Sequence, residues 1–106
     1  MRTYEQMEEI LDTMWRNVEE ATNYMREAYE WRDHCRPYAD WCKTMAAGHM
    51  SFNEAGKPVY ETLKERLRGE PEHAAHVNGI MVIMDRQYAK VSKHMAEANA
   101  MIAAYK

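Results

Sequence analysis

Several side chains that bind metal ions in other proteins occur in this sequence. Glu70 and His73 have the Glu-x-x-His spacing that helical di-iron proteins repeat on two helices. The spacing occurs once here, and Pro71 places it at the start of a helix rather than in a bundle interior. The other histidines and cysteines considered, whose spacing matches no known zinc motif, are His34, Cys35, Cys42, His49 and His76. We therefore expect no metal and no cofactor, although sequence alone does not decide whether these residues bind one.

A column of small polar residues recurs every seven positions in the last third of the chain. Its members are Asn78, Asp85, Ser92 and Asn99. On a helix this column lies between an apolar column and a column that is mostly alanine. It therefore meets water, sets the register between two copies of the helix, or lines a groove for a small molecule. The burial of Asp85 distinguishes these three roles.

A basic stripe accompanies the polar column on the same segment. It consists of Arg86, Lys90 and Lys93. Cations near tyrosine and tryptophan rings can bind a nucleotide through charge and stacking. The same spacing also describes an ordinary solvated helix surface. We treat the polar column and the basic stripe together as candidate ligand or interface residues.

Carboxylates in the first third of the chain allow an enzymatic hypothesis. Glu8, Glu9 and Asp12, followed by Glu30 and Asp33, approach the pattern Glu-Glu-x-x-Glu and later Glu-x-x-Asp. In this pattern, in size and in helicity, the chain resembles the all-helical MazG-type nucleotide pyrophosphohydrolases. The resemblance implies a magnesium ion held between two helices. No residue between the two groups breaks a helix, so we expect these carboxylates on the solvated side of one helix and no enzymatic activity.

Two long amphipathic helices must position all of these residues. Apolar side chains recur at alternating spacings of three and four along both ends of the chain, as is typical of helices that pack lengthwise. The seam of the final helix is Ala74, Val77, Met81, Met84, Tyr88, Val91, Met95, Ala98, Ile102 and Tyr105. The seam of the first helix is Met7, Leu11, Met14, Val18, Ala21, Met25, Ala28 and then Cys35.

The middle of the chain contains the strongest helix-breaking signals. Pro37 predicts a break after the first helix, and residues 38–47 read as a short helix with Tyr38, Trp41, Cys42 and Met45 inward. Residues 48–56 hold two glycines and predict a loop. Pro58 then opens a second short helix, with Val59, Leu63 and Leu67 inward and Gly69 at its end. The predicted fold is one all-α domain, residues 1–106, of two long antiparallel helices plus two short helices.

The predicted lengths of the helices favour an oligomer. A final helix of residues 70–106 is about 50 Å long, and two short helices cannot cover two seams of that length. We expect a homodimer or higher oligomer that completes a four-helix core. The leading functional hypothesis is a non-catalytic interaction protein, an adaptor or a small inhibitor that binds another protein. The alternative is a helical bundle that sequesters a nucleotide or other small polar molecule in an interhelical groove.

Composition excludes some partners. The formal net charge is −3, whereas proteins that bind duplex nucleic acid or anionic membranes carry a basic excess. No apolar run approaches a membrane span, and the acidic first twelve residues lack a signal-peptide core, so we expect a cytoplasmic protein. Residues 1–33 hold nine acidic and four basic side chains. This asymmetry favours a basic partner protein, whose identity, like the organism and the pathway, the sequence does not specify.

Overall fold

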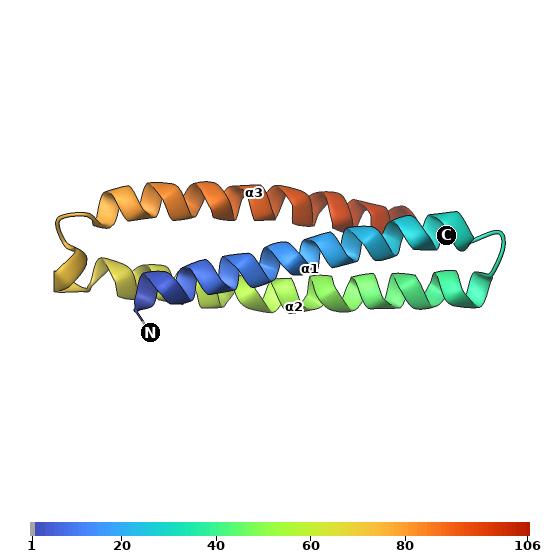
Figure 1. The fold of residues 1–106 in the computed structure, drawn as a ribbon, viewed down its shortest axis with the longest axis horizontal. Helices are drawn as coiled ribbons and strands as arrows, with labels where there is room; N and C mark the ends of the chain where they lie inside the picture. The colour runs from blue at the N-terminus through green and yellow to red at the C-terminus, as the bar shows by residue number, and fades with distance from the viewer. Residues whose placement is uncertain (1) are drawn as a thin grey trace.

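The computed structural model describes residues 2–106 as three long α-helices and one short 3-10 helix (Figure 1). Helix α1 spans Thr3–Trp31, α2 spans Arg36–Arg68, η1 spans Pro71–His73 and α3 spans Val77–Ala104. The helices lie side by side in a rod that measures 58 × 20 × 15 Å. No strand occurs in this part of the chain. The prediction of an all-α fold is confirmed.

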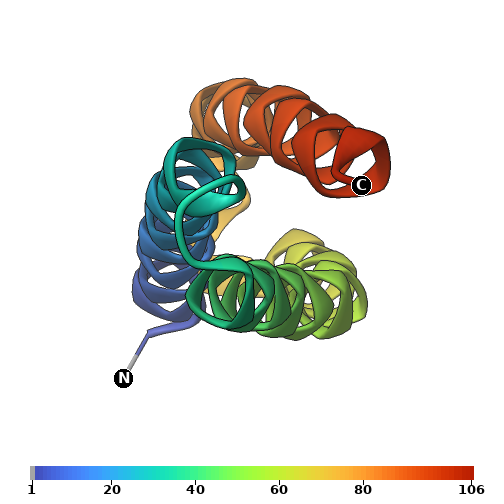
Figure 2. The same cartoon turned by 90° about the vertical axis from the view of Figure 1, so that its right-hand side faces the viewer.

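The chain runs along the rod three times, and α1 lies between α2 and α3 (Figure 2). At one end of the rod the rings of Tyr4 and His73 meet edge to face at 5.7 Å. At the other end the Tyr29 hydroxyl donates a hydrogen bond of 2.7 Å to the carbonyl oxygen of Met101. Helices α1 and α3 are therefore parallel. Our antiparallel prediction was wrong because a third long helix, α2, returns the chain to the starting end before α3 begins.

The two predicted seams form most of the core. All seven apolar seam residues that lie on α1 are buried: Met7, Leu11, Met14, Val18, Ala21, Met25 and Ala28. The final seam is buried or half-buried from Val77 to Tyr105. Its first predicted member, Ala74, is exposed because α3 begins only at Val77. Cys35 is also exposed, because α1 ends at Trp31 before that position is reached.

Helix α2 continues through residues 48–56, where we predicted a loop, so the two predicted short helices are one long helix. Asn53 is fully buried, and its side-chain nitrogen donates a hydrogen bond of 2.8 Å to the carbonyl oxygen of Met14 on α1. A Cβ atom at Gly56 would lie 3.2 Å from the Met14 sulfur. The glycine and the asparagine therefore serve a close crossing of two helices rather than a turn.

Pro58 also lies inside α2, contrary to its predicted place at a helix start. Proline has no N–H group, so the carbonyl of Glu54 loses its helical partner. Both residues are exposed, and water satisfies a carbonyl at such a position. Pro58 therefore removes one backbone hydrogen bond from α2 but does not interrupt the helix.

The reason that we gave for an oligomer does not hold. Helix α2 supplies a third long apolar side, and it covers the methionine-rich seams of α1 and α3 within a single chain. Five methionines of those seams are at most 3% exposed: Met7, Met14, Met25, Met84 and Met95. Any association between copies must therefore use a different surface.

We predict that Gly56→Leu lowers the free energy of unfolding by about 2 kcal/mol, because the new side chain has to displace Met14 from the α1–α2 contact. Gly79→Leu is the matched control, since a Cβ at Gly79 meets no described atom within 4 Å. Urea unfolding followed by circular dichroism measures both variants. Equal stability of the two variants would contradict the close crossing at Gly56.

Candidate functional site

Asp85, the central residue of the predicted polar column, connects α3 to α2. Its Oδ1 atom accepts a hydrogen bond of 2.9 Å from the Tyr60 hydroxyl and lies 2.9 Å from the Lys64 ammonium. The Tyr60 ring is fully buried and stacks on Tyr88 at 4.2 Å. Asp85 therefore already has two partners within the chain, and the interaction fixes how α2 and α3 meet.

The charge state of this cluster follows from its surroundings. Burial acts to raise the pKa of Asp85, but the hydrogen bonds from Lys64 and Tyr60 outweigh it and hold that pKa below its usual value. Burial, together with the bond to Asp85, raises the pKa of the Tyr60 hydroxyl. Tyr60 thus stays a hydrogen-bond donor, and Asp85 a charged acceptor, across the physiological pH range.

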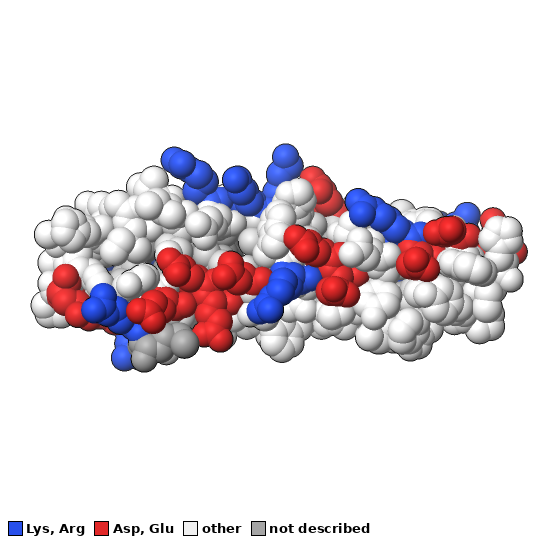
Figure 3. Space-filling view, viewed as in Figure 1, with Lys and Arg blue, Asp and Glu red and all other residues white. Residues whose placement is uncertain are grey.

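The other members of the polar column do not converge on a common site. Asn78 and Asn99 are exposed, and Ser92 is half-buried. The basic stripe, Arg86, Lys90 and Lys93, is exposed on α3. Figure 3 shows basic side chains along the upper border of the molecule, where α3 lies. These seven residues are thus distributed along one helix, and one of them takes part in an interhelical contact.

One hollow between α1 and α3 includes part of the basic stripe. Lys90 lines it together with Trp15 and Asp12, and its volume is about 260 Å³. Pockets that enclose small molecules are usually about 300–1,000 Å³. The volume of this hollow lies below that range, so the hollow is small for a bound nucleotide.

The carboxylates of the enzymatic hypothesis lie far apart. Glu8, Glu9, Asp12 and Glu30 are all exposed on α1, as expected for the solvated side of one helix. The 18 residues between Asp12 and Glu30 correspond to about 27 Å along the helix. A magnesium ion needs oxygen ligands at about 2.1 Å, so these two groups do not share one.

The histidines and cysteines that the sequence offered as possible metal ligands are also distributed along the rod. Cys35 is exposed, Cys42 is buried in the core, and the His49 ring is hydrogen-bonded to Asn17 at 2.7 Å. Among residues 2–106, one group of potential ligands converges, at the turn between α2 and α3. It combines the Glu-x-x-His pair with a further carboxylate that the sequence reasoning did not single out.

An exposed surface with several large apolar side chains lies on the outer side of α2. It is a run of uncharged positions, alternately three and four residues apart, which we call the outer α2 stripe: Tyr38, Trp41, Met45, Gly48, Phe52, Ala55 and Val59. Phe52 is 59% exposed and Trp41 is 49% exposed. The inward placement that we predicted for Tyr38, Trp41 and Val59 was wrong. The buried residues of α2 lie on the neighbouring side of the helix, at Ala39, Cys42 and Ala46.

Charge is absent from the outer α2 stripe and its outer edge. The four charged residues between positions 38 and 59 are Asp40, Lys43, Glu54 and Lys57. They fall on the opposite side of the helix, where Asp40 and Lys43 contact Tyr105 of α3. In Figure 3 the lower border of the molecule, from the middle to the right-hand end, carries no charged side chain. A solvated surface normally mixes charges of both signs, so this face is unusual for a surface that meets only water.

Aromatic contacts hold the outer α2 stripe in place. The Tyr38 ring stacks on Trp41 at 6.0 Å and meets Trp31 of α1 edge to face at the same distance. Tyr24 packs edge to face against Trp41 at 5.7 Å and stacks on His49 at 5.8 Å. Rigid aromatic side chains lose little conformational entropy on binding, which makes such a surface suited to association.

A hollow of about 430 Å³ lies in the middle of the stripe. Gly48 forms part of its floor, with Met45 and Phe52 beside it and Thr13 and Asn17 of α1 along one edge. A Cβ at Gly48 would meet no described atom within 4 Å. Glycine inside a helix costs about 1 kcal/mol relative to alanine, and no contact within the described chain requires it there. The hollow is therefore available to a side chain from another molecule.

Comparison with known family models, curated proteins and solved structures finds no match to this chain. None of the helices between residues 2 and 106 combines the length and apolar character needed to cross a membrane.

We predict that Asp85→Asn lowers the free energy of unfolding at pH 7 by about 1 kcal/mol, because Tyr60 and Lys64 lose a charged partner. We expect a loss of unfolding free energy no larger than this because the Asp85 side chain is 45% exposed, so solvent screens its interaction with Lys64. The folded-state pKa is lowered from 3.8, so the stabilisation is complete above that value and is lost as the pH falls through the lowered pKa. The difference between variant and wild type should therefore narrow as the pH falls below 3.8 and through the lowered pKa.

Asp33→Asn is the control for this prediction, since the Asp33 side chain is 83% exposed and lies 3.9 Å from Arg32. Urea unfolding at a series of pH values measures both variants. If Asp85→Asn lowers the free energy of unfolding no more than Asp33→Asn does, the contact does not hold α3 on α2. The same conclusion follows if the loss for Asp85→Asn is unchanged in acid.

Proposed function

We propose that this protein is a non-catalytic interaction protein that works as a homodimer joined through the outer α2 stripe. In this role it acts as an adaptor or small inhibitor that binds another protein. The observation that supports the proposal is the apolar face of α2, which carries no charged residue of its own and stays exposed although Trp31 and Tyr24 of α1 pack along one border. Interface cores are depleted in charge and enriched in aromatic residues and methionine, and this face has both properties.

The spacing of the stripe favours a second copy of the same chain as the partner. When two α2 helices cross antiparallel about a two-fold axis near residue 50, position i lies opposite position 100 − i of the second copy. This arrangement sets Phe52 against Gly48, Trp41 against Val59, and Met45 against Ala55. Each large side chain then faces a smaller one, and Phe52 of each copy enters the hollow at Gly48 of the other. A two-fold interface requires such self-complementarity.

The size of the stripe suits a stable dimer. From Tyr38 to Val59 it runs about 31 Å along the helix, on a rod that is 20 Å by 15 Å in cross-section. Specific interfaces bury about 800 Å² on each partner, and a strip of this length and width is of that order. The dimer places α1 and α2 of each copy side by side as four helices, through α2 rather than through the final helix.

The dimer leaves the acidic side of α1 free for a further partner. Acidic side chains follow α1 across the middle of Figure 3, whereas basic ones follow α3. A dimer presents the acidic side twice, and two linked sites bind a partner with two matching patches more tightly than one site does. A basic protein surface is the chemistry that suits this arrangement.

Sequestration of a nucleotide or other small polar molecule remains the alternative function, and it has less support. Asp85 is occupied by Tyr60 and Lys64, and the hollow beside Lys90 is small for such a ligand. A nucleotide retained by the purified protein in native mass spectrometry would favour this alternative.

We predict that Phe52→Glu converts the dimer into a folded monomer, because two carboxylates would enter apolar hollows from which water is excluded. Val82→Glu on α3 is the matched control, since Val82 is 58% exposed and lies outside the stripe. Sedimentation velocity at micromolar concentration should give a dimer for the wild type and for Val82→Glu, and a monomer for Phe52→Glu. A monomeric wild type, or a Phe52→Glu variant that stays dimeric, overturns the proposed interface.

Cross-linking tests the direction of the two α2 helices. In the antiparallel arrangement Ser51 lies about 3 Å along the axis from its counterpart, whereas Cys35 lies about 45 Å from its own. We predict that a short bismaleimide links Cys35→Ser, Ser51→Cys chains to each other but leaves the wild type, which carries the exposed Cys35, unlinked. Efficient linkage through Cys35 in the wild type would instead indicate parallel helices.

A further inference from the structure

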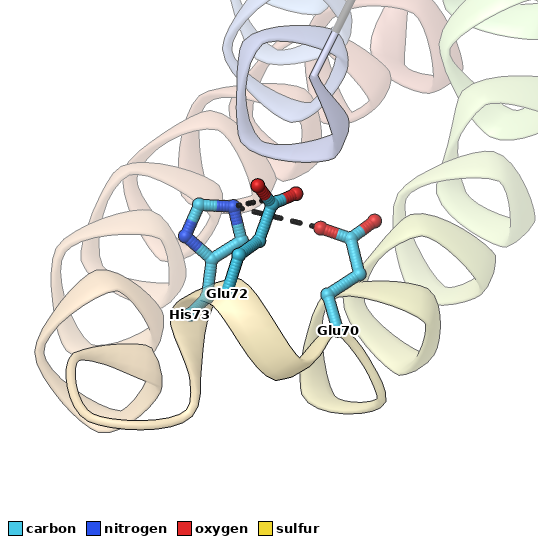
Figure 4. Close-up of side chains that lie close together, drawn as sticks. All are labelled: Glu70, Glu72 and His73. Carbon is cyan, nitrogen blue, oxygen red and sulfur yellow. Dashed lines mark ion pairs between the residues drawn. The ribbon is translucent and has the colours of Figure 1, made fainter.

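Three side chains converge where α2 ends and η1 begins (Figure 4). The Nε2 atom of His73 lies 3.5 Å from Oε2 of Glu70 and 3.7 Å from Oε1 of Glu72. One atom from each of the three residues lies within 4.8 Å of the others. Figure 4 shows His73 and Glu72 beside each other on η1, with Glu70 across from them and the histidine nitrogen facing one oxygen of each carboxylate.

Two of these atoms are buried without a hydrogen bond. His73 is only 9% exposed, and its Nε2 atom has no hydrogen-bond partner among the described residues. The same is true of Oε2 of Glu70. A buried polar atom that lacks a partner costs about 1–3 kcal/mol. The two atoms face each other at 3.5 Å, and a cation bound between them would satisfy both.

Surrounding groups fix the orientation of the ligands. The other carboxylate oxygen of Glu70 accepts a hydrogen bond from the Thr3 hydroxyl of α1. The guanidinium of Arg66 lies 3.7 Å from the same oxygen. The Tyr4 ring packs edge to face against the His73 ring. Metal-binding carboxylates and histidines are usually held in this manner by a surrounding layer of contacts.

We propose that Glu70, Glu72 and His73 bind a divalent transition-metal ion, with Zn²⁺ as the best geometric match. Zinc bonds to nitrogen and oxygen of about 2.0–2.2 Å in a tetrahedron separate neighbouring ligand atoms by about 3.4 Å. The observed separations of 3.5 and 3.7 Å differ from that value by a few tenths of an ångström. Three protein ligands leave a fourth position for water, as in other sites with an open coordination position.

The ligand set also distinguishes between classes of cation. Calcium and magnesium prefer oxygen ligands only, whereas imidazole favours zinc and its neighbours in the first transition series. Because Glu70 also contacts Thr3, an ion at this site holds the start of α1 against the turn between α2 and α3. Binding should therefore raise the melting temperature of the whole chain, because the folded turn orients the three neighbouring ligands toward one point and the unfolded chain does not.

The test begins with metal-free full-length protein titrated with Zn²⁺ in a calorimeter. We expect one ion per chain in the wild type and a higher melting temperature after addition. His73→Ala should abolish this binding, and Glu72→Gln should weaken it by about tenfold or more. Glu72 has a side chain that is 65% exposed, so that variant tests the site even when His73→Ala fails to fold.

Matched controls separate this site from others on the chain. His76→Ala and Glu61→Gln change exposed residues outside the cluster and should bind Zn²⁺ as the wild type does. Co²⁺ as a second probe should give the visible absorption of a site with nitrogen and oxygen ligands and no thiolate-to-cobalt band. Failure of the wild type to bind Zn²⁺, equal binding by Glu72→Gln and wild type, or a thiolate band from Cys35 would each overturn the assignment.

Discussion

The close crossing of α1 and α2 is the contact on which the rest of the molecule depends. Gly56 lets the two backbones approach at Met14, and Asn53 donates its hydrogen bond to the Met14 carbonyl at the same point. A buried polar group that has one good partner disfavours every other register of the two helices. With that register set, the side of α2 at Ala39, Cys42 and Ala46 packs on α1, and the outer α2 stripe faces away from the bundle.

Polar contacts at the two ends of the rod then position α3. At one end Asp85 joins Tyr60 and Lys64 of α2. At the other end the Tyr105 hydroxyl donates a hydrogen bond of 2.8 Å to Asp40 of α2. This bond holds the pKa of Asp40 below its usual value. Methionine-rich seams are adaptable and specify alignment weakly, so these directional bonds determine where α3 lies along its neighbours.

The sequence was sufficient to predict the elements with the strongest periodicity. The seams of α1 and α3 were correct because a period of three and four residues depends on local geometry alone. The main error lay between Gly48 and Pro58, where residues that are typical of loops occur inside a helix. Asn53 and Gly56 serve a contact with α1, and Pro58 is tolerated because it faces water. The same error concealed the outer α2 stripe, whose heptad spacing was present but was divided by the predicted loop. Glu72 was missed because the Glu-x-x-His spacing includes only Glu70 and His73, and the approach of Glu72 to them depends on the turn between α2 and α3.

The central claim is that α2 is one continuous helix whose outer side is apolar and free of charge. Backbone carbon chemical shifts of residues 48–57, measured by nuclear magnetic resonance on the full chain, test it most directly. Helical shifts should continue without interruption from Arg36 to Arg68, with no return to coil values at Gly48 or Gly56. Coil values across residues 48–57 would mean that α2 is two short helices, and the stripe and the dimer built on it would not exist.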